Sequence, residues 1–362
     1  MANFLSKLFS SKLLAGSDNV LGVDIGSSAV KIVQIKKNGG DLILENYGSL
    51  ALGPYAELAV GQATSLTKGQ VVGALGDLLR ETKINAAETV LAIPMKSTMF
   101  AVIEMPELKR KQLEEVIPME ARKYIPVPIE EVALDSWVIP QDEEVSGKGR
   151  KKVNVLIAAI HKETLGRHQD IEAELGLSGG AFEIEIFSTI RAVARKDSPT
   201  ALIVDIGATT TKVALVKEGE IRNTQLINHG AEDATTMISK SFGLDFAEAE
   251  AAKRGLDNAH DANASKISHV VDLSFSPIFS NIERVLSDYQ RKYNITIEQV
   301  ILSGGGVSSA KVQAMAKSML RRDVIVGDPF AKMQTPDVLS ATLKEIGPEF
   351  AVAAGAALSA FD

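Results

Sequence analysis

The sequence contains no cysteine in its 362 residues. Disulfide bonds, zinc sites with thiolate ligands and cysteine nucleophiles are therefore excluded, and the composition is compatible with a reducing compartment. Histidine is also scarce, with five residues at positions 161, 168, 229, 260 and 269. Their spacing is unlike that of metal ligands, so we expect solvated or capping roles for them.

A long apolar run is missing too. No stretch approaches the roughly 18 to 20 apolar residues that a membrane-spanning helix needs, so we expect no transmembrane segment in this chain. A formal net charge of −7 leaves no broad basic face, which argues against nucleic acid as the main partner. Hydrophobic residues make up 45% of the chain, enough for a large core, and the length predicts two domains or one bilobed body.

The first residues carry a small apolar cluster. Phe4, Leu5, Leu8 and Phe9 would share one face of a helix. Two interpretations stay open for residues 1–19: a flexible lead-in, or a weak interfacial or partner-binding helix. We favour the lead-in, because four apolar residues without a polybasic cluster bind membranes poorly.

An internal repeat is the strongest organisational signal. Leu21-Gly-Val-Asp-Ile-Gly-Ser-Ser-Ala-Val-Lys31 returns as Leu202-Ile-Val-Asp-Ile-Gly-Ala-Thr-Thr-Thr-Lys212. Each copy is an apolar run, then Asp-Ile-Gly, small residues, Lys and a second β-branched run, which predicts a strand, a tight turn and a second strand. Duplication at half-chain spacing predicts two similar lobes.

Each Asp-Ile-Gly unit is suited to a polyphosphate. The strand would deliver Asp24 or Asp205 to its end, where Mg²⁺ could be held largely through water. The following turn would present backbone N–H groups to an anion, with hydroxyl groups and Lys31 adding donors and positive charge. The candidate phosphate-binding residues are Gly26, Ser27, Ser28, Lys31, Gly207, Ala208, Thr209 and Thr210. The alternative is an ordinary β-turn in which Asp caps a loop; the second copy favours a nucleotide site.

A glycine triplet supports this interpretation. Ser303-Gly-Gly-Gly306 follows a short strand and precedes a helix, so a base or an α-phosphate could lie on bare backbone near a helix N-terminus. The chain lacks the Walker-A lysine motif and the G-x-G-x-x-G fingerprint.

The remaining patterns predict an α/β chain. Between the repeats we expect strands at 90–93, 99–105, 132–139, 153–160 and 182–187, a charged hairpin at 141–152, and a helix at 162–175. Another helix would place Leu113, Val116, Ile117, Ala121 and Tyr124 near one face, with Pro118 kinking or dividing it. After the second repeat we expect helices at 231–255, interrupted near Gly243, and at 274–293, 309–320 and 349–358, with a strand at 300–302.

These motifs resemble those of the actin, heat-shock-chaperone and sugar-kinase superfamily, a bilobed fold with a duplicated ribonuclease H-like core. Within it the chain is most similar to the FtsA-type branch and to the PilM family of type IV pilus assembly. Glu120-Ala-Arg-Lys-Tyr-Ile-Pro-Val-Pro-Ile-Glu-Glu-Val132 is similar to the PilM inserted subdomain, although Val127 stands where phenylalanine is common. Ala249-Glu-Ala-Ala-Lys253 matches a helix of this branch that contacts ribose and base through the positions of Glu250 and Lys253.

The resemblance implies a domain plan. A first actin-like lobe would span residues 20–198, with an inserted α+β subdomain at about 88–180. A second lobe would span 199–362, with a helical insertion at about 231–297. The adenosine loop of the superfamily matches Gly304, Gly305 and Gly306.

The resemblance also implies a function. We expect a cytoplasmic adaptor, loaded with ATP and Mg²⁺, that captures the N-terminal cytoplasmic tail of the single-pass protein PilN in a groove beside the inserted subdomain. It would lie at the inner face of the inner membrane through this partner, and other pilus platform proteins and the assembly motor are further candidate partners. A small-molecule kinase of the same fold and an FtsA-like filament-forming protein are the alternatives.

Hydrolysis is the open point. The superfamily places a water-orienting group where the first lobe passes into the second, and Glu185 matches best, beside the candidate metal-binding Asp24 and Asp205. Glu183 lies nearby, and both glutamates could instead be solvent-facing residues of a strand. The resemblance implies slow turnover at most, with the nucleotide as a structural or switching ligand.

Overall fold

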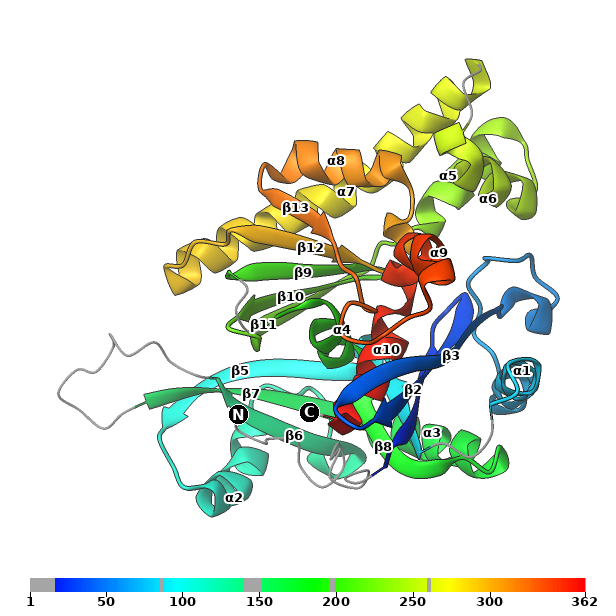
Figure 1. Cartoon of the computed structure of the whole chain (residues 1–362). Helices are drawn as coiled ribbons and strands as arrows, with labels where there is room; N and C mark the ends of the chain where they lie inside the picture. The colour runs from blue at the N-terminus through cyan, green and yellow to red at the C-terminus, as the bar shows by residue number, and fades with distance from the viewer. Residues whose placement is uncertain (1–16, 85–87, 140–151, 196–198, 259–261, 362) are drawn as a thin grey trace.

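The computed structural model describes residues 17–84, 88–139, 152–195, 199–258 and 262–361. Two five-stranded sheets share one topology (Figure 1). The first has the order β3 (Asp41–Ala51), β2 (Ala29–Asn38), β1 (Asn19–Ile25), β4 (Glu88–Ile93), β8 (Ser178–Ile184). The second has the order β11 (Glu220–Ile227), β10 (Thr211–Lys217), β9 (Ala201–Ile206), β12 (Gln299–Ser303), β13 (Asp323–Val326). In both, the first three strands are antiparallel and the last two run parallel to the central one. The duplicated, bilobed fold is therefore confirmed.

The first sheet is covered by helices that begin where the sequence favours them. Helix α1 (Lys68–Glu81) starts with a capping box, in which the Thr67 side chain accepts from Gln70 N and the Gln70 side chain accepts from Thr67 N. Its apolar positions pack into the same core as α3 (Lys162–Glu174) and α4 (Glu185–Val193). Strand β8 ends at Ile184, three residues before the expected end at 187, and α4 begins directly after it at Glu185.

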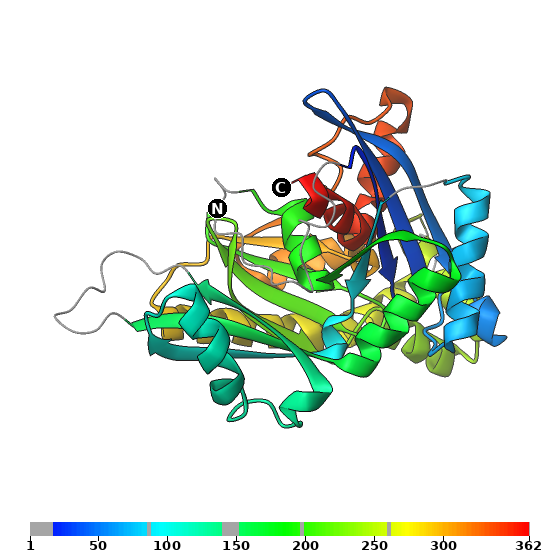
Figure 2. The same cartoon turned by 90° about the horizontal axis from the view of Figure 1, so that it is seen from below.

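A third, antiparallel sheet lies between β4 and β8 in the sequence. It has the order β5 (Thr98–Pro106), β7 (Lys152–His161), β6 (Val132–Ile139), with α2 (Arg110–Ala121) packed on it (Figure 2). The expected charged hairpin at 141–152 lies almost wholly outside the described residues, as do residues 1–16 of the lead-in.

Helix α2 differs from expectation in two ways. It continues through Pro118, so it is not divided there. Tyr124 lies beyond the helix end and is 54% exposed, so it does not join the apolar face. Leu113, Ile117 and Ala121 are buried in this subdomain's own core, together with residues of β5 and β7. Most of the apolar surface expected here is therefore used internally.

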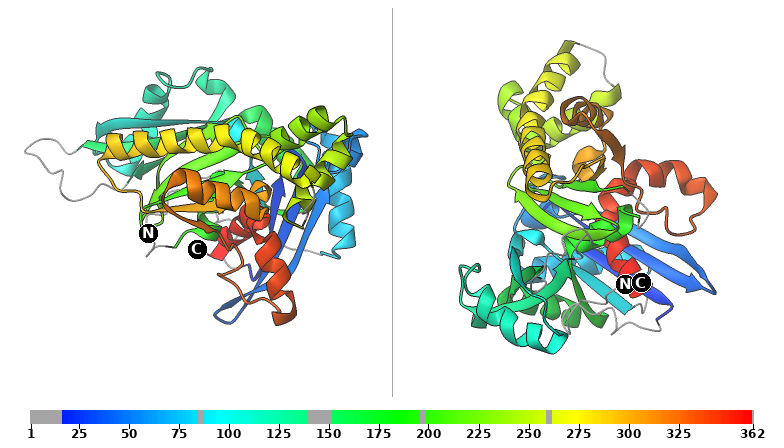
Figure 3. Two further views of the ribbon diagram at one scale, coloured as in Figure 1. Left: turned by 90° about the horizontal axis from the view of Figure 1, so that it is seen from above. Right: turned by 90° about the vertical axis from the view of Figure 1, so that its left-hand side faces the viewer.

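The second sheet carries a helical layer on one face (Figure 3). Helices α5 (Glu232–Phe242) and α6 (Phe246–Arg254) are separated at Gly243, as the sequence predicts. Helix α7 (Ala262–Tyr293) is longer than expected and packs with α8 (Ala310–Leu320) over the sheet. No helix within the described ranges is both long and apolar enough to span a membrane.

The C-terminal helix α10 (Ala351–Leu358) lies in the middle of the molecule and follows α9 (Ser340–Ile346). All eight of its residues are buried. A Cβ at Gly355 would lie 1.8 Å from Ser188 O, so α10 and α4 approach more closely than any side chain would allow. Helix α10 therefore packs closely against α4.

Candidate functional site

The two repeat hairpins form the same turn. Gly26 N donates to Ala29 O at 3.0 Å, and Gly207 N donates to Thr210 O at 2.9 Å. In register, Asp24 pairs with Lys31 across the first hairpin, and Asp205 pairs with Lys212 across the second. Each turn therefore places one aspartate and one lysine side by side at its base.

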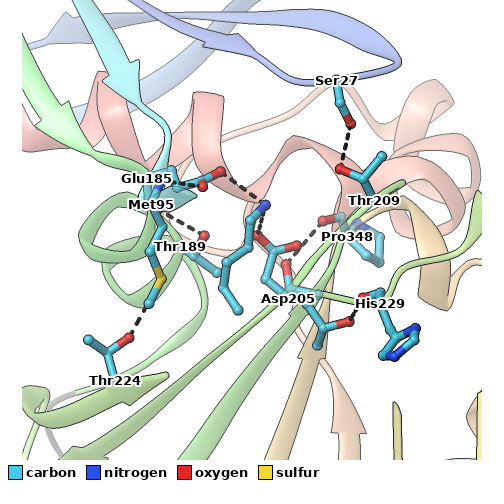
Figure 4. A network of polar contacts seen from close by, with 12 residues as sticks. Ser27, Met95, Glu185, Thr189, Asp205, Thr209, Thr224, His229 and Pro348 are labelled. Carbon is cyan, nitrogen blue, oxygen red and sulfur yellow. Dashed lines mark hydrogen bonds and ion pairs between the residues drawn. The ribbon is translucent and has the colours of Figure 1, made fainter. Parts of the chain in front are cut away.

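The loops of the two hairpins meet. Thr209 Oγ1 donates to Ser27 Oγ at 3.3 Å, although the residues are 182 positions apart (Figure 4). A backbone hydrogen bond from another segment also fixes each loop. Leu52 N donates to Ser28 O at 2.9 Å, and Glu232 N donates to Ala208 O at 2.9 Å. The structure thus brings together the hydroxyl-bearing residues that the sequence assigned to phosphate binding.

A charged cluster lies at the base of the loops. Glu185 Oε1 accepts from Met95 N at 2.6 Å, and Glu185 Oε2 lies 3.0 Å from Lys212 Nζ. The same ammonium lies 3.4 Å from Asp205 Oδ2. Burial would lower the pKa of Lys212, but the carboxylates of Asp205, Glu185 and Asp24 together raise it above its usual value. Lys212 is therefore a permanent cation.

The surroundings of Asp24 favour its uncharged form. Burial is the largest effect and raises the pKa of Asp24 to about 6, against the opposing charge of Lys31. Lys31 Nζ lies 3.8 Å from Glu349 Oε2, a contact between the first hairpin and the segment before α10. The first hairpin thus carries a carboxylate that ionises only near neutral pH.

Glu183, just before α4, and Glu185, its first residue, are both buried. Glu183 is 2% exposed and binds Arg191, with Arg191 Nη2 at 2.7 Å from Glu183 Oε1. Glu185 is 7% exposed and is the first residue of α4. The solvent-facing interpretation of both was wrong: Glu183 supports the helix, and Glu185 faces the cluster.

The glycine triplet lies against the second hairpin. Ser303 pairs with Asp205 in register, and Gly304 has φ +88°. A Cβ at Gly304 would lie 2.3 Å from Asp205 Oδ1, so only glycine fits. The helix N-terminus expected to receive a phosphate is occupied instead, because Asp257 Oδ2 accepts from Ala310 N at 2.8 Å. The triplet keeps its bare backbone, but the first amides of α8 are capped from α6's end.

Glu250 and Lys253 lie in a second network. Lys253 Nζ is 2.7 Å from Glu250 Oε2 and donates to Thr235 Oγ1 at 2.7 Å, and Thr235 Oγ1 donates to Glu250 Oε2 at 2.6 Å. A Cβ at Gly61 would lie 3.3 Å from Glu250 Cγ, so a first-lobe loop reaches this network. These two residues therefore hold α5 and α6 together beside that loop.

Two partners in the cluster were missed by sequence reasoning. Lys212 was part of the repeat but was not assigned to the site; its register with Asp205, equal to that of Lys31 with Asp24, was the available signal. Met95 contributes only a backbone N–H, for which the sequence carries no signal.

The duplicated sheets, the facing hairpin loops and the glycine triplet define an actin-like ATPase fold. The chain belongs to the family described as type IV pilus assembly protein PilM, which matches residues 22–361. The resemblance drawn from the motifs is thereby confirmed.

Solved structures agree with this assignment. A PilM–PilN type IV pilus biogenesis complex is similar over 95% of this chain and 98% of that chain, with a TM-score of 0.80 and 25% identity. MreB5 of Spiroplasma citri bound to ADP covers 93% and 94%, with a TM-score of 0.53 and 13% identity, a likeness of fold alone. Cell division protein FtsA of Bacillus subtilis (strain 168) is 24% identical over 270 residues, 66% of this chain; the chain spans 61% of that relative's length.

Proposed function

We propose that this chain is an ATP-binding adaptor of type IV pilus assembly that captures the N-terminal cytoplasmic tail of PilN. Family membership and the likeness to a PilM–PilN complex support this assignment. Through that partner the chain would lie at the cytoplasmic face of the inner membrane, where other platform proteins and the assembly motor are further candidate partners. The observation that carries the proposal is a groove at the edge of the first lobe.

The groove lies between α1 and the α3–β8 connection and has a volume of about 630 Å³. Four partly buried apolar side chains line it, Leu79, Ile84, Leu175 and Leu177. Arg80 and Lys83 stand on its rim. A groove lined by apolar side chains together with charged ones suits a peptide that inserts apolar side chains. Ser178 at the start of β8 lines this groove and pairs with Glu88 at the start of β4, whereas the subdomain of β5, β6 and β7 follows the other end of β4 at Ile93. The groove is therefore at the opposite end of these strands from the subdomain beside which the sequence led us to expect the tail.

The residues where the two hairpins meet would bind the triphosphate of ATP. Two buried ammonium groups, Lys31 and Lys212, have side chains only 13% and 12% exposed, and the hydroxyl groups of Ser27 and Thr209 face each other above them. Ser28, Gly26, Gly207, Ala208 and Thr210 would complete the loops, and Gly304–Gly306 would support the adenosine. When bound, the nucleotide would supply negative charge that joins the two hairpins. Asp24 and Asp205 would hold Mg²⁺ through water.

Binding of a synthetic peptide with the PilN N-terminal sequence, labelled for fluorescence anisotropy, tests the partner. Leu79→Ser and Leu177→Ser should each weaken binding by about tenfold or more, because each removes an apolar contact from the groove. Val338→Ser is the matched control, since Val338 is 87% exposed and does not line the groove. Added salt should change the affinity little, because apolar anchors dominate.

The outcome against this proposal is equally definite. Crosslinks from the peptide to α5 or α6, with no effect of Leu79→Ser or Leu177→Ser, would remove the groove as the binding site.

A further inference from the structure

One segment of the first lobe leaves the first hairpin loop, reaches the second lobe and returns. It begins after Leu52, whose N–H donates to Ser28 O at 2.9 Å, and it ends at Thr64, whose N–H donates to Ser27 O at 2.8 Å. We call residues 53–63 the strap. The strap lies between β3 and α1 in the chain and extends toward α5 and α6 (Figure 1). Both of its ends are therefore fixed to the first hairpin loop.

The far part of the strap contacts the second lobe. Ala63 N donates to Glu232 Oε1 at 3.2 Å. A Cβ at Gly61, which has φ +86°, would lie 3.3 Å from Glu250 Cγ, so the strap backbone packs against the Glu250 side chain. Glu232 is the first residue of α5, and Glu250 lies within α6. Two contacts from one segment thus join the first lobe to two helices of the second.

Glu232 is connected to both hairpin loops. Its backbone N–H donates to Ala208 O of the second hairpin loop at 2.9 Å. Its side chain accepts from Ala63, and the next residue of the chain, Thr64, donates to Ser27 O of the first hairpin loop. One residue of α5 therefore links the second loop directly and the first loop through the strap. Separation of the lobes at this point requires loss of the hydrogen bond between Ala63 and Glu232.

We propose that Glu232 is a positioning residue of the nucleotide site, and that its hydrogen bond to the strap holds the lobes together and limits how fast a nucleoside triphosphate enters and leaves. The role at the nucleotide rests on the proposed function and adds a regulation of that site. The hydrogen bond joins protein to protein, so it contributes no direct contact to the ligand. Its loss should therefore speed entry and exit alike and change the affinity little.

Stopped-flow fluorescence of the full chain with N-methylanthraniloyl-ATP measures both rates. Glu232→Ala should raise the association and dissociation rate constants by about fivefold or more each, because the lobes separate more readily. The dissociation constant should change by less than about threefold. Glu232→Gln retains a side-chain carbonyl that can accept from Ala63 N, so this variant should keep the wild-type rates.

Asp233→Ala is the matched control. It removes the neighbouring carboxylate of α5, which accepts from Gly230 N at 3.4 Å and lies 2.8 Å from His229 Nδ1 in its own lobe. The charge change equals that of Glu232→Ala, but the contact with the strap is retained. Both rate constants should therefore match those of the wild type.

Spin labels test the contact between the lobes without nucleotide. The chain has no cysteine, so Gly73→Cys on α1 and Lys240→Cys on α5, both exposed positions, would be the only labelled sites. Electron–electron double resonance should give a broader distribution of label distances with Glu232→Ala than with the wild type, Glu232→Gln or Asp233→Ala. If Glu232→Ala does not fold, Ala63→Pro removes the donor of the same hydrogen bond and should have the same effects.

Two results would overturn the inference. One is a Glu232→Ala variant with wild-type rates and wild-type label distances, which would make the hydrogen bond a local contact of the strap. The other is a rise in the dissociation rate alone, with an equal loss of affinity, which would place Glu232 in direct contact with the ligand. If the wild type binds no nucleotide, the nucleotide site itself is refuted, and the label distances alone then support or refute the contact between the lobes.

Discussion

Thr209 and Ser27 touch through their hydroxyl groups at 3.3 Å, although they belong to separate copies of the repeat. This contact closes the two hairpin loops on each other. On the proposed function a triphosphate would lie between the loops, and we expect it to separate these side chains.

A crosslink at this contact should therefore block the nucleotide. The chain has no other cysteine, so a Ser27→Cys/Thr209→Cys variant can form only one intramolecular disulfide. The oxidised variant should lose the rise in melting temperature on addition of ATP, and reduction should restore it. ATP present during oxidation should slow formation of the crosslink. Equal ATP affinity before and after oxidation, with both single-cysteine variants as controls, would exclude these loops as the binding site.

Asp24 predicts an unusual pH dependence of stability. Its pKa of about 6 lies well above the value of about 3.9 expected in the unfolded chain. Between these values the folded state binds more protons than the unfolded state, so the contribution of Asp24 to stability falls as the pH rises from 4 to 6. Burial is the largest cause of the raised pKa of Asp24, and the nearby charges of Lys31, Glu185, Lys212 and Asp205 modify it.

Asp24→Asn removes the buried charge. At pH 7.5 the nucleotide-free variant should be more stable than the wild type by on the order of 2 kcal/mol in urea unfolding. This advantage should shrink as the pH falls through 6 toward 4. Asp41→Asn, at the exposed first residue of β3, should differ little from the wild type at any pH. A stability difference that stays constant with pH would contradict the raised pKa.

The network around Lys253 predicts a stability effect distinct from nucleotide binding. Lys253→Met would leave Glu250 with Arg254 as its remaining cation, 2.7 Å from Oε1, and Thr235 with one partner fewer. Unfolding free energy should fall by about 1–3 kcal/mol, less than the roughly 3–5 kcal/mol of a buried pair that loses one member outright, because Arg254 still binds Glu250. Lys240→Met, at an exposed position of α5, should change it by less than about 0.5 kcal/mol. An unchanged Lys253→Met variant would show that the network contributes little.

Features that depend on neighbouring residues could be predicted from the sequence, whereas features that depend on contacts between distant residues could not. The hairpins, with Asp24 and Asp205 at the strand ends, depend on neighbouring residues, and their repetition made them evident. The end of β8 depends on a distant contact: Glu185 starts α4 and accepts from Met95 N, 90 residues earlier. The apolar pattern alone predicted a strand that continues beyond Ile184, where β8 ends.

The same reasoning explains the other misses. Val116, Ile117 and Ala121 give a helical period that α2 retains through Pro118, because packing on β5 and β7 outweighs the lost backbone hydrogen bond. The capping of α8 by Asp257 joins segments 53 residues apart and leaves no local pattern. Sequence reasoning therefore found the residues that form the two hairpin loops but not their ion pairs.

Turnover of ATP should be slow because Glu185 is already engaged. One of its oxygens accepts from Met95 N and the other binds Lys212, so the carboxylate has little freedom to orient or deprotonate a water. Steady-state hydrolysis should stay at least about a hundredfold below the median enzyme rate of roughly 10 per second. Glu185→Gln should lower this residual rate by less than tenfold, whereas loss of a true general base costs about 10² to 10⁴. Fast phosphoryl transfer to an added sugar or carboxylate acceptor, abolished by Glu185→Gln, would make the chain a kinase rather than an adaptor.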